Sequence, residues 1–317
     1  MANRGNKEPH SAFPIRYSLF AIRYSPYTLH SLFAIRHSPY TRPMSETRHQ
    51  PNEPRRTLIL TGASRGIGHA TVKRFASAGW RVITCSRHAF PENCPWAAGP
   101  EDHIQVDLSS RDDTMRAVAE MRERLRANGG RLDALVNNAG ISPKGSASDN
   151  GSDSAGGRAG APTGAAQSTR LSVLNSSVDV WRQVFEVNFF ATIWLATGLI
   201  EELKRAQGAI VNVTSIAGSR VHPFAGSAYA TSKAALASLT REMAADFGPL
   251  GVRVNAIAPG EIDTAILSPG TEKLVEHLPL RRLGLPEEVA KAIYYLCTEQ
   301  SSYVTGAELH INGGQHV

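Results

Sequence analysis

The chain has 317 residues, 42% of them hydrophobic and 20% charged, which is typical of a globular protein with one large domain or two small ones. No apolar run approaches the roughly 18 residues that a membrane span needs, so we expect no membrane segment. The three cysteines (Cys85, Cys94 and Cys297) form no C-x-x-C motif, which argues against a disulfide framework and favours a reducing, cytoplasmic setting.

The formal net charge of +6 is concentrated at the N-terminus. Residues 1–43 contain six of the 34 Lys and Arg residues and one of the 28 acidic residues, which leaves 28 basic and 27 acidic residues for 44–317. The body of the protein is therefore close to neutral. We expect no nucleic-acid-binding surface on it.

The N-terminal segment contains a nearly verbatim repeat, because LFAIRYSPYT at 19–28 returns as LFAIRHSPYT at 32–41. Two decapeptides, each broken by Ser-Pro, are too short for a solenoid, whose repeats run about 20–50 residues. Three interpretations stay open: an Arg- and Ser-rich targeting segment, a basic arm for nucleic acid or anionic lipid, or repetitive DNA translated from too early a start. We favour the third, with Met44 as the first residue, and expect 1–56 to form a disordered basic tail outside the fold.

From residue 57 onward, short β-branched runs alternate with helical segments. Strands without polar alternation, separated by helices, indicate a parallel sheet covered on both faces. We therefore predict a single Rossmann-type, doubly wound α/β domain over 57–317. The expected strands are 57–62, 81–86, 103–107, 132–138, 209–215 and 252–258, and the expected helices lie near 67–78, 111–127, 179–205 and 229–247.

Two segments of this domain stand out by composition. Residues 142–170 are rich in Gly, Ser and Ala without large apolar residues, so we expect a flexible surface insertion there, not a domain boundary. The predicted helix 179–205 is apolar nearly all round, which indicates burial on two sides, including contact with a partner subunit.

The first strand is followed by TGASRGIG, which places Gly62, Gly66 and Gly68 in a strand-to-helix turn. Such glycines let backbone N–H groups approach a phosphate at the helix N-terminus, although glycine-rich turns also serve tight packing. The spacing is one residue longer than the usual dinucleotide fingerprint. Its position after the first strand nevertheless favours dinucleotide binding.

The end of the second strand bears on the choice between NAD and NADP. An NAD enzyme needs a carboxylate there for the ribose hydroxyls, but this strand ends in Ser86 and Arg87 with no acid. Arg87, together with Arg65 in the glycine turn, would attract a 2′-phosphate. The alternative is that both arginines are merely solvated. The charges favour NADP as the cofactor, with NAD possible.

Tyr229 and Lys233 are four residues apart in AYATSK, so they project from the same side of one predicted helix. An ammonium group beside a phenol favours phenolate, and we expect it to lower the pKa of Tyr229 and make it a proton donor and acceptor. Ser215 ends a strand, where open α/β sheets build their sites. Asn188 is a polar side chain in an apolar helix and so needs a partner.

At this point the chain resembles the short-chain dehydrogenase/reductase family over about 57–317. The motifs occur in order: TGASRGIG, Asp107, NNAG (137–140), Asn188, Ser215, YATSK and PGEIDT (259–264), with RRLGLPEEVA and INGG near the end. In sequence it is similar to reductases described as 3-oxoacyl-carrier-protein reductase-like or glucose-dehydrogenase-like.

The resemblance implies a hydride-transfer enzyme for a small carbonyl or alcohol substrate, assembled as a homotetramer or homodimer, with no metal. It implies Tyr229 as general acid/base and Lys233 as the residue that tunes it and holds the nicotinamide ribose. Ser215 would orient the carbonyl, and Asn188 would anchor a water that links Lys233 to solvent. Cofactor contacts are implied at Gly62, Ser64, Arg65, Gly66, Ile67, Gly68, Arg87, Asp107 (adenine), Leu108, Asn138, Ala139, Gly140, Tyr229, Lys233, Pro259, Gly260, Ile262 and Thr264.

Two alternatives from other classes stay open. A dinucleotide-sensing regulator would keep the site but use it for binding, and a nucleic-acid binder would use the basic tail. The substrate is not specified by the sequence. Arg220 and His222 near the serine, with the segment 265–282, suit a polar or anionic carbonyl compound, but an interpretation as surface residues is equally good.

Overall fold

The computed structural model describes residues 55–90, 99–144 and 170–317, except 266, 268 and 269. The described residues belong to one compact unit, Asn52–Val317. The predictions for the tail, including the start at Met44, and for most of the insertion fall outside the described residues.

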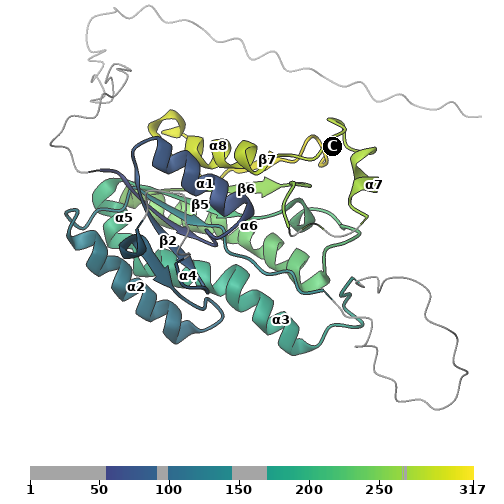
Figure 1. Ribbon diagram of the computed structural model, residues 1–317, viewed down its shortest axis with the longest axis horizontal. Coiled ribbons are helices and arrows are strands. Elements are labelled where there is room, and N and C mark those ends of the chain that lie inside the picture. The colour runs from purple at the N-terminus through teal and green to yellow at the C-terminus, as the bar shows by residue number, and fades with distance from the viewer. Residues whose placement is uncertain (1–54, 91–98, 145–169, 266, 268–269) are drawn as a thin grey trace, which may run out of the picture. The chain divides into compact units, whose positions relative to one another are not determined.

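Seven parallel strands form one sheet in the order β3-β2-β1-β4-β5-β6-β7 (Figure 1). β1 has β2 on one side and β4 on the other, so the strand order reverses beside β1. This arrangement confirms the predicted doubly wound sheet, and it opens a crevice at the carboxyl ends of the strands. The strands are β1 (Thr57–Thr61), β2 (Arg81–Ser86), β3 (His103–Gln105), β4 (Ala134–Asn137), β5 (Ala209–Val213), β6 (Arg253–Pro259) and β7 (Glu308–Ile311).

Alternating side chains of β1 pack into two separate cores. Leu58 and Leu60 pack on the side covered by α1 and α8, whereas Ile59 packs on the side covered by α2, α4 and α6 (Figure 1). Because both faces are covered, the strands need to be apolar throughout, as their sequences are. These helices are α1 (Gly66–Ser77), α2 (Arg111–Arg126), α4 (Ala191–Gly198), α6 (Ser227–Phe247) and α8 (Pro286–Cys297).

The single helix predicted for 179–205 is divided in the structure. It begins as α3 (Val178–Phe185), passes through a π-helical turn (Glu186–Phe190) into α4, and bends by 60° before α5 (Ile200–Ala206). At the bend, a Cβ on Gly198 would lie 2.7 Å from Val118 Cγ1, so this glycine allows α4 to approach α2 closely. Among the described residues no single helix is long and apolar enough to span a membrane. The two arms of this bent helix, Val178–Gly198 and Ile200–Ala206, have the necessary length and apolar composition only when they are counted together.

The C-terminal part contains elements that hydrophobic periodicity did not predict. α8 begins with Pro286, and the Glu288 carboxylate accepts the Leu285 backbone N–H at 2.8 Å, which caps its first turn. β7 then adds the edge strand beside β6. The short helix α7 (Glu272–Val275) lies in the segment after β6; the 3-10 turns are Pro100–Asp102, Ile216–Gly218, Gly248–Leu250 and Glu299–Ser301.

Candidate active site

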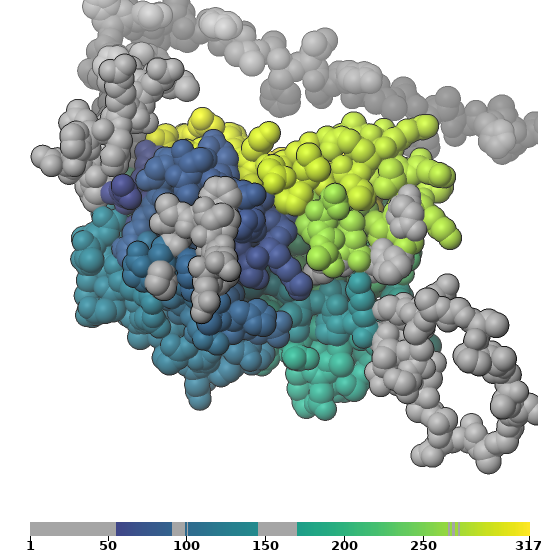
Figure 2. Space-filling view, in the orientation of Figure 1, coloured from purple at the N-terminus to yellow at the C-terminus, as the bar shows by residue number. Residues whose placement is uncertain are grey.

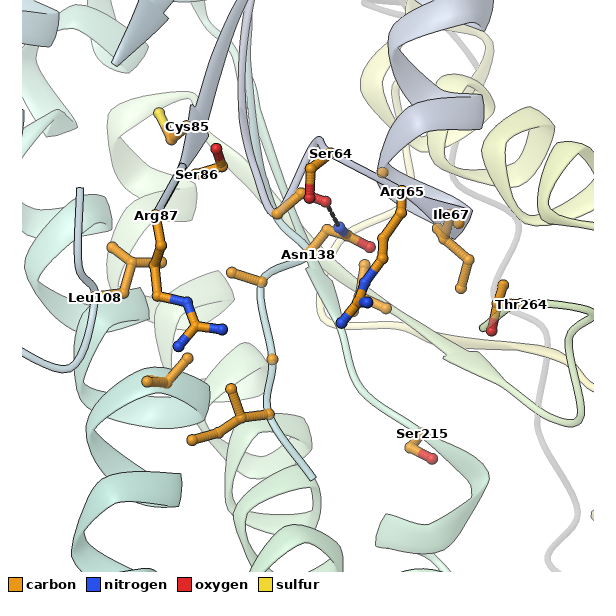
Figure 3. A pocket seen from close by; sticks show the side chains of 18 of the residues that line it. Ser64, Arg65, Ile67, Cys85, Ser86, Arg87, Leu108, Asn138, Ser215 and Thr264 are labelled. Atoms are coloured by element: carbon orange, nitrogen blue, oxygen red, sulfur yellow. Dashed lines mark hydrogen bonds between the residues drawn. The ribbon is translucent and has the colours of Figure 1, made fainter. Parts of the chain in front are cut away.

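A cavity of about 550 Å³ lies at the carboxyl ends of the strands (Figure 3). It is lined by segments from both halves of the chain, which meet on the surface where blue and green to yellow residues adjoin (Figure 2). Every predicted cofactor residue lines it, and so does Ser215; Asn188 does not. The other residues that line the cavity were not predicted from the sequence. They are Cys85, Ser86, His88, Val106, Ser109, Ile141, Gln183, Val187, Val213, Thr214, Ala265 and Leu267.

The glycine turn has no room for side chains. Gly62 has φ +67°, a left-handed conformation that glycine adopts without strain. A Cβ on Gly68 would lie 2.1 Å from the Gly62 carbonyl oxygen. The turn therefore brings the exposed N–H groups at the start of α1 to the cavity wall, which is the arrangement that a dinucleotide phosphate requires.

The NNAG segment is fixed to this turn by hydrogen bonds. Asn138 Nδ2 donates to the carbonyls of Thr61 and Gly62, at 3.1 and 2.9 Å. The Thr61 hydroxyl accepts the backbone N–H groups of Asn138 and Ala139, both at 3.1 Å. These bonds lock the ends of β1 and β4 together, so the two halves of the cavity floor have a defined spacing. Thr61 was not recognised in the sequence, where it reads only as the last residue of a strand.

The end of the cavity beside β2 is basic. Arg87 follows β2, Arg65 precedes α1, and both side chains extend into the pocket (Figure 3). Asp107 lines the same region, and its Oδ1 accepts the N–H and hydroxyl of Ser109 at 3.0 and 2.8 Å. The strand end itself carries no acid.

The opposite end of the cavity contains the tyrosine, the lysine and the serine. Tyr229 and Lys233 lie one turn apart on α6, and Ser215 follows β5. Lys233 is 3% exposed; its Nζ donates to the Val213 carbonyl at 2.7 Å and lies 5.7 Å from the Tyr229 ring centroid. Burial lowers the pKa of Lys233 to about 8, so its ammonium form dominates at neutral pH.

The pKa of Tyr229 shifts in the direction opposite to the one predicted. Burial raises it, a hydrogen bond with Ser215 lowers it, and the negative charge of Glu261 raises it further. The physical reason is burial of the phenol, which disfavours the charged phenolate. The Lys233 ammonium, which the prediction assumed to be directed at the phenol, donates to the Val213 carbonyl instead.

Asn188 has the hydrogen-bond partners that its position in an apolar helix required. It lies in the π-helical turn, where its Oδ1 accepts the Ile141 N–H at 2.8 Å. Its Nδ2 donates to the Ile141 carbonyl and to Ser232 Oγ, at 3.1 and 3.0 Å. A Cβ on Gly140 would lie 3.4 Å from Asn188 Oδ1 and 3.3 Å from Lys233 Nζ, so both side chains contact the same glycine.

Arg220 and His222, considered from the sequence as substrate contacts, do not line the cavity. The Arg220 guanidinium donates to the Gln315 carbonyl, and His222 contacts the Glu261 carboxylate. Across the described ranges, no group of three or more His, Cys, Asp or Glu side chains is placed to hold a metal ion. The cavity thus combines a phosphate-binding turn with a tyrosine, a serine and a buried lysine.

Comparison with known families agrees with this site. A model described as "short chain dehydrogenase" matches residues 56–155, and one described as "Enoyl-(Acyl carrier protein) reductase" matches residues 161–316. The chain belongs to the short-chain dehydrogenase/reductase family and is an NAD(P)-dependent oxidoreductase of alcohol and carbonyl groups.

Three relatives illustrate the similarity. Protein FixR of Bradyrhizobium diazoefficiens is 57% identical over 267 residues, which cover 84% of this chain and 88% of that protein. The 3-oxoacyl-[acyl-carrier-protein] reductase FabG of Aquifex aeolicus is 33% identical, over 81% and 95%. A crystal structure of a Brucella ovis short-chain dehydrogenase/reductase with a partially ordered NAD is 60% identical, with a TM-score of 0.66, over 81% and 100%.

Proposed function

We propose that this protein transfers a hydride between NADP(H) and a small carbonyl or alcohol compound through Tyr229, Lys233, Ser215 and Asn188. The observation that carries this proposal is the convergence of the glycine turn and the tyrosine, lysine and serine on one cavity. A nicotinamide dinucleotide, when bound, supplies or accepts the hydride.

The side chains handle the proton and the substrate oxygen. In the reducing direction, the Tyr229 hydroxyl donates its proton to the oxygen of the carbonyl as the hydride reaches the carbon, which yields an alcohol and a phenolate. Ser215, hydrogen-bonded to Tyr229, holds the same oxygen. The positive charge of Lys233, 5.7 Å from the Tyr229 ring centroid, would offset part of the cost of the buried phenolate until solvent returns the proton. Oxidation of the alcohol reverses these steps.

Asn188 and Lys233 both contact Gly140, which supports a shared path for that returning proton. Asn188 Nδ2 and Oδ1 hold the Ile141 backbone in place, and the π-helical turn moves this asparagine out of the helical register of its neighbours. π-Helical turns are frequent at functional sites because they reposition one side chain in this way. We assign Asn188 the role of anchoring a water beside Lys233.

The preference for NADP follows from the basic end of the cavity. Arg65 and Arg87 line it, and no carboxylate ends β2 to accept the ribose hydroxyls. NAD is the second candidate, favoured by the NAD in the 60% identical Brucella ovis relative.

A homodimer or homotetramer is supported by a partly exposed aromatic stripe along α3 and α4. Neighbouring rings follow one another from Trp181 through Phe185, Phe189 and Phe190 to Trp194, with centroids 5.3–6.4 Å apart. Phe190 is 39% exposed. An aromatic surface of this length is unusual on a monomer, and a second copy of the chain would cover it.

The same proposal assigns the catalytic function to residues 57–317 and none to the tail before Met44. Free, buried thiols at Cys85 and Cys297 support a reducing, cytoplasmic setting.

The experiment that tests the function is consumption of NADPH and NADH over a panel of ketones, aldehydes, quinones and acyl thioesters. We expect turnover that falls about 10²–10⁴-fold in Tyr229→Phe, because that variant loses the proton donor. The fully exposed Tyr303 offers a matched control, Tyr303→Phe, which should keep full activity. Dinucleotide binding without turnover of any substrate would instead support a sensor.

A further inference from the structure

Glu261 is a buried carboxylate beside the active site that the proposed mechanism does not use. It follows the Pro259–Gly260 turn after β6, and its side chain is 6% exposed. Its Oε1 accepts from His222 Nε2 at 2.5 Å and from Gln315 Nε2 at 3.1 Å. Burial alone would raise the pKa of Glu261, but the hydrogen bonds from His222 and Gln315 hold it below its usual value, so the group is ionised.

The hydrogen bond from His222 helps to keep Glu261 ionised. The His222 Nδ1 accepts the Phe224 backbone N–H at 3.2 Å, so the ring donates to Glu261 from Nε2. This hydrogen bond and the one from Gln315 lower the pKa of the carboxylate.

Through these bonds Glu261 joins three segments that surround the cavity. His222 belongs to the loop after Ser215, and Gln315 belongs to the C-terminal segment. The Arg220 guanidinium donates to the Gln315 carbonyl and so closes the same cluster. On the cavity side, a Cβ on Gly260 would lie 2.6 Å from Gln315 Oε1, so the C-terminal segment packs directly against the turn that lines the cavity.

We propose that Glu261 is a positioning residue of the hydride-transfer site: its ionised carboxylate ties the loop after Ser215 and the C-terminal segment to the Pro259–Gly260 turn, and places a fixed negative charge near Tyr229. This role goes beyond the proposed set of catalytic residues and rests on the proposed function of Tyr229.

The guanidinium of Arg282, which lies near Glu261, is paired with another carboxylate. Arg282 and Glu288 share a small cavity of about 100 Å³ with Glu261 and form a bidentate ion pair at 2.7 and 2.8 Å. Burial is the largest cause of the raised pKa of Tyr229, and the negative charge of Glu261 raises this pKa further, which favours the protonated hydroxyl over the phenolate.

The test is Glu261→Gln, which keeps the shape and the hydrogen-bond acceptor but removes the charge. Ionisation of Tyr229 is followed by phenolate absorbance against pH, with the signal of Tyr229→Phe subtracted, and circular dichroism marks the pH range in which the fold persists. We expect ionisation at lower pH in Glu261→Gln. Glu202→Gln is the matched control. Glu202, in α5, is a buried carboxylate paired with Arg122 of α2 and with Arg205. The Glu202→Gln substitution should leave the titration of Tyr229 unchanged.

The second readout is the pH profile of turnover on the best substrate of the panel. In the reducing direction, the loss of activity at high pH should shift to lower pH in Glu261→Gln. Glu261→Leu, which also loses the two hydrogen bonds, should lower kcat by roughly a hundredfold, as misplacement of a catalytic group does. If no substrate is turned over, the proposed function fails, and the absorbance titration still decides the role of Glu261. Identical titrations of Glu261→Gln and the unsubstituted chain, up to the pH at which the fold is lost, overturn the inference.

Discussion

At the scale of single residues, the proposed preference for NADP depends on Arg87, which lines the cavity beside β2. We expect Arg87→Ala to weaken NADPH binding about 10–100-fold, since each charge-assisted hydrogen bond contributes roughly 1.5–3 kcal/mol, and to leave NADH binding nearly unchanged. Dissociation constants for both dinucleotides, measured by nucleotide fluorescence, check this. Arg241→Ala, at an exposed arginine of α6, is the control for loss of one positive charge. Equal weakening of NADPH binding and NADH binding would show that Arg87 does not contact the 2′-phosphate.

The residues proposed as catalytic were singled out in the sequence because each had a separate positional signal. Tyr229 and Lys233 had helical spacing, Ser215 ended a strand, and Asn188 was polar in an apolar helix. Their electrostatics could not be predicted, because the pKa of Tyr229 depends on burial of the phenol and on contacts with Ser215 and with Glu261, which is 32 positions further along the chain. Long-range contacts of this kind leave no trace in local spacing.

At the scale of elements, the glycine turn before α1 depends on atoms that approach too closely for a side chain. In Gly68→Ala the new Cβ would lie 2.1 Å from the Gly62 carbonyl, so the backbone must shift. We expect the free energy of unfolding to fall by about 1–3 kcal/mol, as overpacking typically costs. We also expect dinucleotide binding to weaken about tenfold, equal to roughly 1.4 kcal/mol. Denaturant unfolding and nucleotide titration measure the two effects.

Gly248 supplies the control for that substitution. It has φ −53°, and nothing lies within 4 Å of a Cβ built on it. Gly248→Ala should keep dinucleotide affinity and raise the free energy of unfolding by about 0.4–1 kcal/mol, because alanine restricts the unfolded chain. A loss of dinucleotide affinity in both variants would mean that the turn before α1 is not the phosphate site.

Hydrophobic periodicity located most elements but not their interruptions. β2 has the predicted bounds Arg81–Ser86, because a fully buried strand gives a sharp β-branched run. The predicted helix 179–205 contains a π-helical turn, in which Asn188 is hydrogen-bonded to Ile141, and a 60° bend, at which Gly198 packs on Val118. An apolar pattern that continues all round a helix cannot reveal either the π-helical turn or the bend.

At the scale of the whole molecule, topology was predictable because strands alternating with helices admit few arrangements. The edge strand β7 and the helix α8 were missed as elements, since Glu308–Ile311 contains only four residues and lacks the continuous apolar run of a buried strand. The contribution of the C-terminal segment to the site, through Gln315 and Glu261, was missed for the same reason: short edge elements acquire their role from the neighbours on which they pack.

The aromatic stripe on α3 and α4 predicts how copies of the chain assemble. In a two-fold symmetric interface each substitution occurs twice, so Phe190→Glu would bury two carboxylates against apolar rings. We expect the unsubstituted chain to have two or four times its 34.2 kDa mass, and Phe190→Glu to shift toward 34.2 kDa. Light scattering during size-exclusion chromatography measures this. Tyr303→Glu, at a fully exposed aromatic residue outside the stripe, should keep the original mass. An unchanged mass in Phe190→Glu would place the subunit contact elsewhere, and a monomeric unsubstituted chain would leave the stripe for another partner.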